Sequence, residues 1–217
     1  MQKMLSRMLL SMVLLGALLI PQPQGVQARL RQVVDPTGFV VNSAGDNGDS
    51  NLGDGICSTG VSCTLRAALQ EAASLSSSTQ LITFSFSAKT LIPIYSPLPA
   101  LSDADQILGD GRVTIDGTLT PDNDNDIGLL LTNYEPASVS GLQIQNFSKA
   151  GIRIRGNDKI IGGSAPNFRN VIINNGIGID FATDNVYDNT IIGNYIGVAA
   201  DGVTAQPNGI GINVATM

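Results

Sequence analysis

Near-identical short segments recur towards the end of this chain, and they restrict its possible folds more than any other sequence feature. Asn175–Thr183 (NGIGIDFAT) is nearly duplicated by Asn208–Thr216 (NGIGINVAT), and Gly151–Arg155 (GIRIR) is a third copy. Their glycines at 151, 176 and 209 lie 25 and 33 residues apart. A second series, Lys159–Gly163 and Thr190–Asn194, has an offset of 31 residues. Two interleaved series with similar offsets indicate that several short strands recur in order within each repeat.

Each Gly-Ile-x-Ile segment alternates with a period of two, which directs its isoleucines to one face of a β-strand. Such strands are too short and too rich in glycine to be stable alone, but parallel stacking of the copies buries a continuous isoleucine column. We therefore expect an all-β fold, a right-handed parallel β-helix with roughly three strands per turn. The unequal offsets predict protruding loops at residues 181–189 and 199–207. The expected inward column comprises Ile152, Ile154, Ile177, Ile179, Ile210 and Ile212.

The residues before these repeats contain one clear helix candidate, residues 64–73. Its apolar positions follow the spacing i, i+3, i+4 and i+7, and Ser62 or Thr64 can cap its N-terminus. A helix at the start of a parallel stack would cover an otherwise open sheet edge, so we expect it to act as a lid. Further strands are expected at residues 80–86, 113–116 and 141–145.

The first 28 residues have the pattern of a secretory signal peptide. Lys3 and Arg7 precede an apolar run at residues 8–20, and Val-Gln-Ala at 26–28 is a small-residue cleavage site. The run covers only about 20 Å as a helix, which is short of a membrane span. We therefore expect export to the extracellular space or the cell surface, with no transmembrane segment in the mature chain.

The predicted organisation is a signal peptide at 1–28, an N-terminal cap region at 29–75 and the β-helix at 76–217. The chain stops at Met217 directly after a repeat strand, so we expect the β-helix to be truncated at its C-terminus. Cys57 and Cys63 are the two cysteines, and such a pair in an exported chain predicts a disulfide.

Composition excludes several kinds of site. The chain has no histidine, which rules out histidine-based catalytic triads and histidine-ligated metals. Two of the 12 basic residues and none of the 18 acidic ones lie in the signal, so cleavage changes the net charge from −6 to −8. A negative charge disfavours nucleic acid, whose binding requires a positive surface.

Two stretches of the chain resemble a known group of secreted bacterial proteins. Cys57 to Ala68, ending in Cys-Thr-Leu-Arg-Ala-Ala, resembles the CSLREA motif near the start of such proteins, with Ala67 where the motif has glutamate and Glu71 one turn later. The later Ile-Ile repeats are similar to pectin-lyase-like β-helix repeats of the same proteins. The resemblance implies a secreted or surface-exposed β-helix. Polysaccharide-cleaving enzymes share that fold, so the fold alone does not imply an activity.

Stacking the three repeat copies by their first glycines places Arg155, Asp180 and Asn213 in one outward column. Arg153, Gly178 and Gly211 would form the neighbouring column. Because adjacent strands lie about 4.8 Å apart, Arg155 and Asp180 can touch. This pair is a weak candidate for binding or deprotonating a sugar acid, and an ordinary cross-strand ion pair is the favoured explanation. Asn175 and Asn208 predict a short asparagine ladder that ends where Ala150 stands.

Two acidic loops are weak candidates for Ca²⁺, which prefers oxygen ligands from Asp and Asn in glycine-containing loops. Both also have the composition of solvated turns. The first comprises Asp46, Asp49, Asn51 and Asp54, and the second comprises Asp122, Asp124 and Asp126.

The sequence therefore predicts a secreted or surface-exposed β-helix scaffold with a structural, adhesive or binding role. Extracellular polysaccharide or a cell-surface partner is the expected ligand. The alternative is a polysaccharide lyase or glycoside hydrolase of the pectin-lyase-like type, which requires positioned titrating groups.

Overall fold

The computed structural model describes residues 37–75, 79–102, 104–182 and 186–214, and the expected signal peptide lies outside these ranges. Within them the chain is mostly strand, with one α-helix, α1 (Leu65–Ser74), and one short 3₁₀ turn, η1 (Pro166–Phe168). The pairings between the named strands are all parallel. The expected all-β class with parallel pairing is therefore confirmed.

The strands form three parallel ladders. A nine-stranded sheet contains two of them, because β4 (Gln106–Asp116) and β6 (Ser138–Gln145) each run through both. The first ladder joins the early halves of β4 and β6 to β1 (Thr37–Val41), β2 (Gln80–Phe84), β8 (Ile160–Gly162) and β11 (Thr190–Ile192). The second joins their late halves to β3 (Thr90–Pro93), β9 (Val171–Ile173) and β12 (Tyr195–Ile196). The third is a separate sheet of β5 (Ile127–Leu131), β7 (Ala150–Ile154), β10 (Ile177–Phe181) and β13 (Ile210–Val214).

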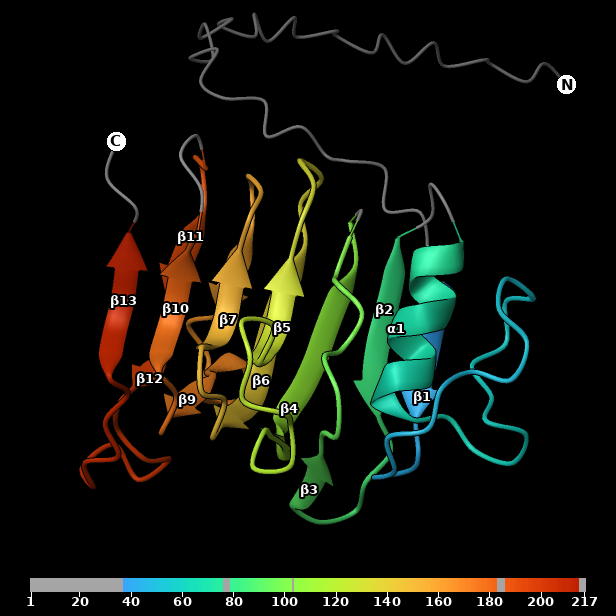
Figure 1. Ribbon diagram of the computed structural model, residues 1–217, viewed down its shortest axis with the longest axis horizontal. Helices are drawn as coiled ribbons and strands as arrows, with labels where there is room; N and C mark the ends of the chain where they lie inside the picture. Colours follow the sequence, from blue (N-terminus) through green and yellow to red (C-terminus); the bar gives the residue numbers. More distant parts are fainter. Residues whose placement is uncertain (1–36, 76–78, 103, 183–185, 215–217) are drawn as a thin grey trace, which may run out of the picture. The chain divides into compact units, whose positions relative to one another are not determined.

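The chain visits these ladders in a fixed order. From β8 onwards it passes through the first, second and third ladder in turn, and then repeats the cycle with β11, β12 and β13. Figure 1 shows β5, β7, β10 and β13 side by side along the third ladder. Two interleaved repeat series in the sequence correspond to two of these ladders, since β8 pairs with β11 and β10 pairs with β13.

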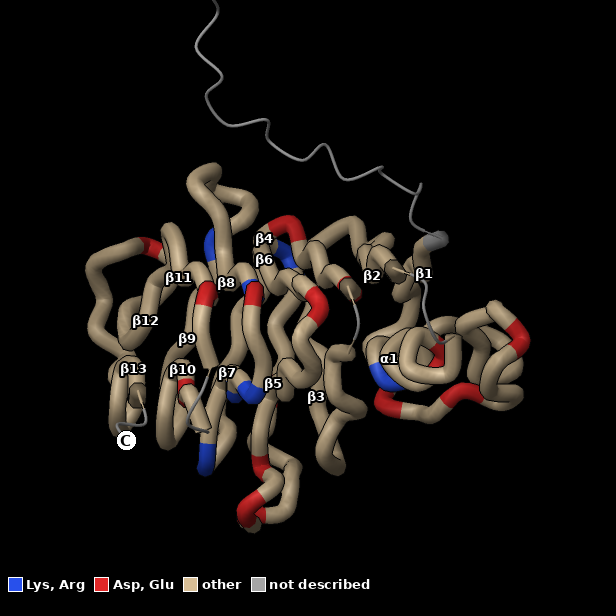
Figure 2. The backbone as a smooth tube through the Cα atoms, turned by 90° about the horizontal axis from the view of Figure 1, so that it is seen from above, with Lys and Arg blue, Asp and Glu red and all other residues tan. Residues whose placement is uncertain are grey.

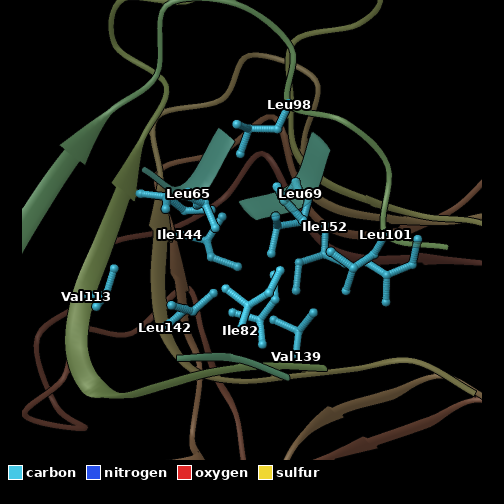
Figure 3. Packing of buried hydrophobic residues seen from close by; sticks show 14 of the residues in the cluster. Leu65, Leu69, Ile82, Leu98, Leu101, Val113, Val139, Leu142, Ile144 and Ile152 are labelled. Carbon is cyan, nitrogen blue, oxygen red and sulfur yellow. The ribbon is translucent and has the colours of Figure 1, made fainter. Parts of the chain in front are cut away.

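Alternating apolar side chains form continuous columns inside the ladders. In the third ladder Leu129 lies opposite Ile152, which lies opposite Ile179, and at most 1% of each side chain is exposed. Figure 3 shows buried residues from several strands meeting Leu65 and Leu69 of α1. Full burial of one such side chain stabilises the fold by roughly 1.5–3 kcal/mol, so each column is a major stabilising feature.

The predicted register of the first repeat copy is wrong by two residues. Ile152 pairs with Ile179, not with Ile177, and Ala150 stands opposite Ile177. Both glycines of the NGIG segment approach neighbouring backbone closely. A Cβ atom on Gly176 would lie 2.1 Å from the carbonyl oxygen of Ser148, and one on Gly178 would lie 2.5 Å from that of Gly211. The glycine of the first copy, Gly151, aligns with the second of them, Gly178. A shift of two residues preserves the inward face.

Exposure varies along the expected isoleucine column. Ile152, Ile154 and Ile179 are fully buried, whereas Ile210 is 49% and Ile212 is 44% exposed. Both belong to β13, the outermost strand of the third ladder. Among the described residues, β13 has a partner strand on one side only.

The predicted lid helix is confirmed as α1, one residue later than expected. Thr64 is its N-cap, and its hydroxyl oxygen accepts the N–H of Ala67 at 3.0 Å. The apolar face is buried and joins the common core, while the helix contacts β1, the outermost strand of the first ladder. Figure 2 shows α1 beside β1, away from β13. That buried face comprises Leu65, Ala68, Leu69 and Ala72.

An asparagine ladder satisfies backbone groups at the turn before the third ladder. The backbone N–H and the Nδ2 of Asn175 both donate to Oδ1 of Asn208, at 2.9 and 3.0 Å. In the turn before, Asn175 Oδ1 accepts the N–H of Phe147, so Phe147 rather than Ala150 holds the matching place. The predicted ladder exists, and its predicted end at Ala150 is wrong, because Phe147 holds the matching place. Comparable side-chain contacts link Asn170 to Asn194 and Asn189 to Lys159.

Candidate functional site

Cys57 and Cys63 form a disulfide with Cα atoms 5.2 Å apart, as predicted. The bond closes the loop that precedes α1, and Cys63 is buried against the core. Beside it lies an open pocket of about 480 Å³ between β1 and this loop. No charged side chain lines the pocket, so it offers no ionisable group for catalysis.

We expect the purified, non-reduced protein to have a mass two hydrogens below that of its reduced form. Peptide mapping should link the segments that contain Cys57 and Cys63. Recovery of two thiols that alkylate readily in the folded protein would contradict the assignment.

The carboxylates of the first acidic loop are occupied by hydrogen bonds and an ion pair within the chain. Asp46 turns towards α1, where its Oδ2 lies 2.8 Å from Nη2 of Arg66. Asp49 and Asp54 close local turns by accepting backbone N–H groups from Asn51 and Ile56, respectively. Within the described ranges, no three His, Cys, Asp or Glu side chains are grouped so that they could hold a metal. The loop geometry therefore gives the calcium prediction no support.

A buried carboxylate on α1 holds this loop in place. Glu71 is fully buried, and its two oxygens accept the backbone N–H groups of Gly53 and Gly55. Figure 2 marks acidic positions in the loop beside α1. Glu71 therefore has a structural contact that links helix and loop.

The second acidic loop is also internally bonded. Asp122 accepts the hydroxyl of Ser148, Asp126 accepts the backbone N–H of the same serine, and Asp124 lies 3.8 Å from the ammonium of Lys149. Asp122 and Asp126 thus both hold Ser148, while Asp124 faces Lys149.

On the outward face of the third ladder the ion pair joins Asp180 to Arg153, not to Arg155. Arg153 Nε lies 2.8 Å from Asp180 Oδ2, and Asn213 Nδ2 donates to Oδ1 at 2.8 Å. Arg155 follows β7 with an exposed side chain. Both oxygens of Asp180 are therefore engaged by neighbouring strands, as expected of a cross-strand ion pair. Gly178 is buried beneath Gly211 and does not floor a groove beside this pair.

A different outward face, on the second ladder, carries a chain of polar side chains that we call the polar face. It is defined by Thr114, Asp116, Gln143 and Gln145. Gln143 pairs with Thr114 across the ladder, and Gln145 pairs with Asp116. Gln143 Nε2 donates to Gln145 Oε1 at 2.6 Å, and Gln145 Nε2 donates to Asp116 Oδ2 at 2.8 Å. The two side-chain amides of β6 and the carboxylate on β4 thus form a fixed array.

Asp116 is held as a carboxylate at the end of this array. Burial raises its pKa, but hydrogen bonds from Thr118, Gln145 and Asn146 together lower it, and the net pKa lies below the ordinary 3.8. The carboxylate is therefore an acceptor near neutral pH. A general acid needs a pKa near the working pH, so Asp116 fits binding better than proton transfer.

The lowered pKa predicts a pH-dependent contribution to stability. Because the folded-state pKa is depressed, the stabilisation is present above the unfolded pKa and is lost as the pH falls through the folded one. We expect the melting-temperature difference between wild type and Asp116→Asn to shrink from about pH 7 to about pH 2. A difference that stays constant over this range would show that the carboxylate charge contributes nothing.

Three cationic side chains lie beside the polar face. Lys89, Arg112 and Arg169 line a pocket of about 40 Å³ together with Thr114 and Gln143. Sequence reasoning missed both the polar face and these cations, because they come from different rungs of the ladder. Alignment of the strand pattern Val-Thr-Ile-Asp at 113–116 with Leu-Gln-Ile-Gln at 142–145 could have found the polar columns.

Comparison of the chain with protein-family models, with curated proteins and with solved structures finds no match. The function must therefore be argued from the site. No α-helix in the described part of the chain is long and apolar enough to cross a membrane.

Proposed function

We propose that this chain is an extracellular right-handed parallel β-helix that binds a glycan through the polar face of its second ladder. The observation that carries this proposal is the continuous array from Gln143 through Gln145 to Asp116. Amide and carboxylate groups on a rigid sheet are suited to hydrogen bonding with sugar hydroxyls, because they lose little conformational entropy on binding.

Three parallel ladders visited in a fixed order support the β-helix part of the proposal. A right hand is expected because crossovers between parallel strands are right-handed in about 98% of cases. The disulfide is consistent with an oxidising compartment. Export by a signal peptide at 1–28 and relation to the CSLREA-motif proteins remain parts of the proposal.

Glycan binding is tested with the mature protein on a panel of neutral and acidic polysaccharides. We expect binding that Gln143→Ala weakens by about tenfold, which corresponds to the loss of one or two hydrogen bonds. Asn213→Ala, on the outward face of the third ladder, is the matched control and should bind normally. Absence of binding to every polysaccharide, or equal loss in both variants, would contradict the proposal.

The same incubations test the enzymatic alternative if unsaturated products and new reducing ends are followed. We expect no turnover, since Asp180 is held in an ion pair and Asp116 has a lowered pKa. Turnover that disappears in Asp116→Asn would favour a polysaccharide lyase or hydrolase over a binding module.

A further inference from the structure

The cations beside the polar face occupy one column of the second ladder. Leu91, Thr114, Gln143 and Val171 are aligned on successive strands. Two residues earlier in the chain come Lys89, Arg112, Gly141 and Arg169, of which Lys89 and Arg169 lie just before β3 and β9. Three of the four positions in this column are therefore cationic.

The glycine in this column lets neighbouring backbone segments approach it closely. Gly141 has φ +70°, and a Cβ atom there would lie 2.5 Å from the carbonyl oxygen of Asn167. No larger residue fits this backbone without strain. Arg112 and Arg169 lie on either side of β6, so their backbones are about 10 Å apart, or two rungs of about 4.8 Å. The small pocket lies where these side chains meet.

The positive charge of this column is largely not neutralised by carboxylates of the protein. Arg112 has one exposed partner, Asp110, at 3.5 Å. Arg169 donates Nε–H to the carbonyl oxygen of Gly193, and its guanidinium lies 4.1 Å from the centre of the Tyr195 ring. Neither of these contacts of Arg169 neutralises its charge. Like charges on adjacent strands repel one another, so an anion in the pocket would relieve the repulsion.

We infer that this pocket binds a tetrahedral oxyanion, a sulfate ester or phosphate monoester, carried by a glycan that lies on the polar face. Three cations are matched by the three terminal oxygens of such a group, whereas a carboxylate offers two. The pocket volume of about 40 Å³ accommodates one small group and not a sugar ring. This inference rests on the proposed glycan binding.

The position of Asp116 favours glycans whose anionic groups are far apart. Asp116 lies two residues beyond Thr114 on β4, a separation of about 6.6 Å along the strand. Its lowered pKa keeps it negative, so a second anionic group at that distance would be repelled. A sparsely sulfated or phosphorylated glycan should therefore bind better than a polymer with a carboxylate on every sugar.

The test compares one galactan before and after chemical desulfation, with polygalacturonate as the densely charged reference. We expect the sulfated galactan to bind the mature protein at least tenfold more tightly than both others. Arg112→Ala and Arg169→Ala should each remove most of this preference while leaving binding of the desulfated galactan intact. Lys149→Ala removes the same charge from the turn before the third ladder and serves as control. Inorganic phosphate and sulfate, titrated separately, should compete with the sulfated galactan and show whether one ester is preferred.

The outcomes distinguish failure of the oxyanion pocket from failure of glycan binding as a whole. Equal binding of sulfated and desulfated galactan, unaffected by Arg112→Ala, would overturn the oxyanion pocket and leave glycan binding in place. Failure of all three polymers to bind would overturn the proposed function itself. Loss of affinity in Lys149→Ala equal to that in Arg112→Ala would show a general charge effect and would also overturn the pocket.

Discussion

Ile152→Ala is expected to destabilise the fold by about 2–5 kcal/mol, the usual cost of truncating a fully buried isoleucine. Ile152 is 0% exposed and lies between Leu129 and Ile179 on the neighbouring strands. Truncation would remove contacts with both and leave a cavity in a closely packed column. Chemical denaturation of the mature protein, monitored by circular dichroism, measures the difference.

Ile212→Ala is the matched control, because Ile212 belongs to the same column and the same type of strand. It is 44% exposed on the outermost strand, so its truncation should cost only about 1 kcal/mol. If the two substitutions cost the same, then the packing of the column does not depend on strands on both sides, and the stacked arrangement is wrong.

Asn175→Ala should cost about 2–5 kcal/mol although it removes no apolar contact of comparable size. Its Oδ1 accepts the N–H of Phe147, and its Nδ2 donates to the carbonyl oxygen of Ile144. Both bonds are buried, and a buried polar group left without a partner costs about 1–3 kcal/mol. The free energy of unfolding from urea titration is the appropriate measurement.

Asn213→Ala again provides the comparison. Asn213 is half-buried and makes a single side-chain bond to Asp180 on the outward face. Water can replace that bond, so the cost should stay below about 1 kcal/mol. An Asn175 variant as stable as the Asn213 variant would mean that the ladder does not organise the turns.

Sequence alone predicted the parallel strands, the inward face and the lid helix because each depends on a local period. The two-residue period of the Gly-Ile-x-Ile segments survives an error of two residues in register, so the buried face was assigned correctly. The register itself could not be predicted, since the NGIG segment contains two glycines and only packing decides which one stacks. Both approach neighbouring backbone closely, and it is Gly178 that aligns with Gly151 of the first copy.

The site was harder to predict because its members are distant in sequence. Lys89, Arg112 and Arg169 meet only after their strands have been placed in register. The aspartate-rich loops were conspicuous in the sequence, but their carboxylates bind nearby backbone groups and cations. The structural role of Glu71 was not predicted either. Its buried carboxylate accepts the N–H of Gly53, and this contact leaves no periodic pattern in the sequence.

The most direct test of the stacked arrangement is disulfide trapping between neighbouring rungs of the third ladder. Arg153 and Asp180 are direct partners on β7 and β10, which places their Cα atoms about 4.8 Å apart. This separation lies within the range of a disulfide. Cysteines at 153 and 180 should therefore link in the oxidised protein, as detected by mass spectrometry of peptides from the non-reduced sample.

Cysteines at 155 and 180 provide the comparison within the same experiment. Arg155 lies two residues further along the strand, and the added distance of about 6.6 Å takes the pair beyond disulfide reach. We expect efficient linkage for positions 153 and 180 and none for 155 and 180. Linkage of the second pair in place of the first would contradict the register of the third ladder, on which its buried isoleucine column depends.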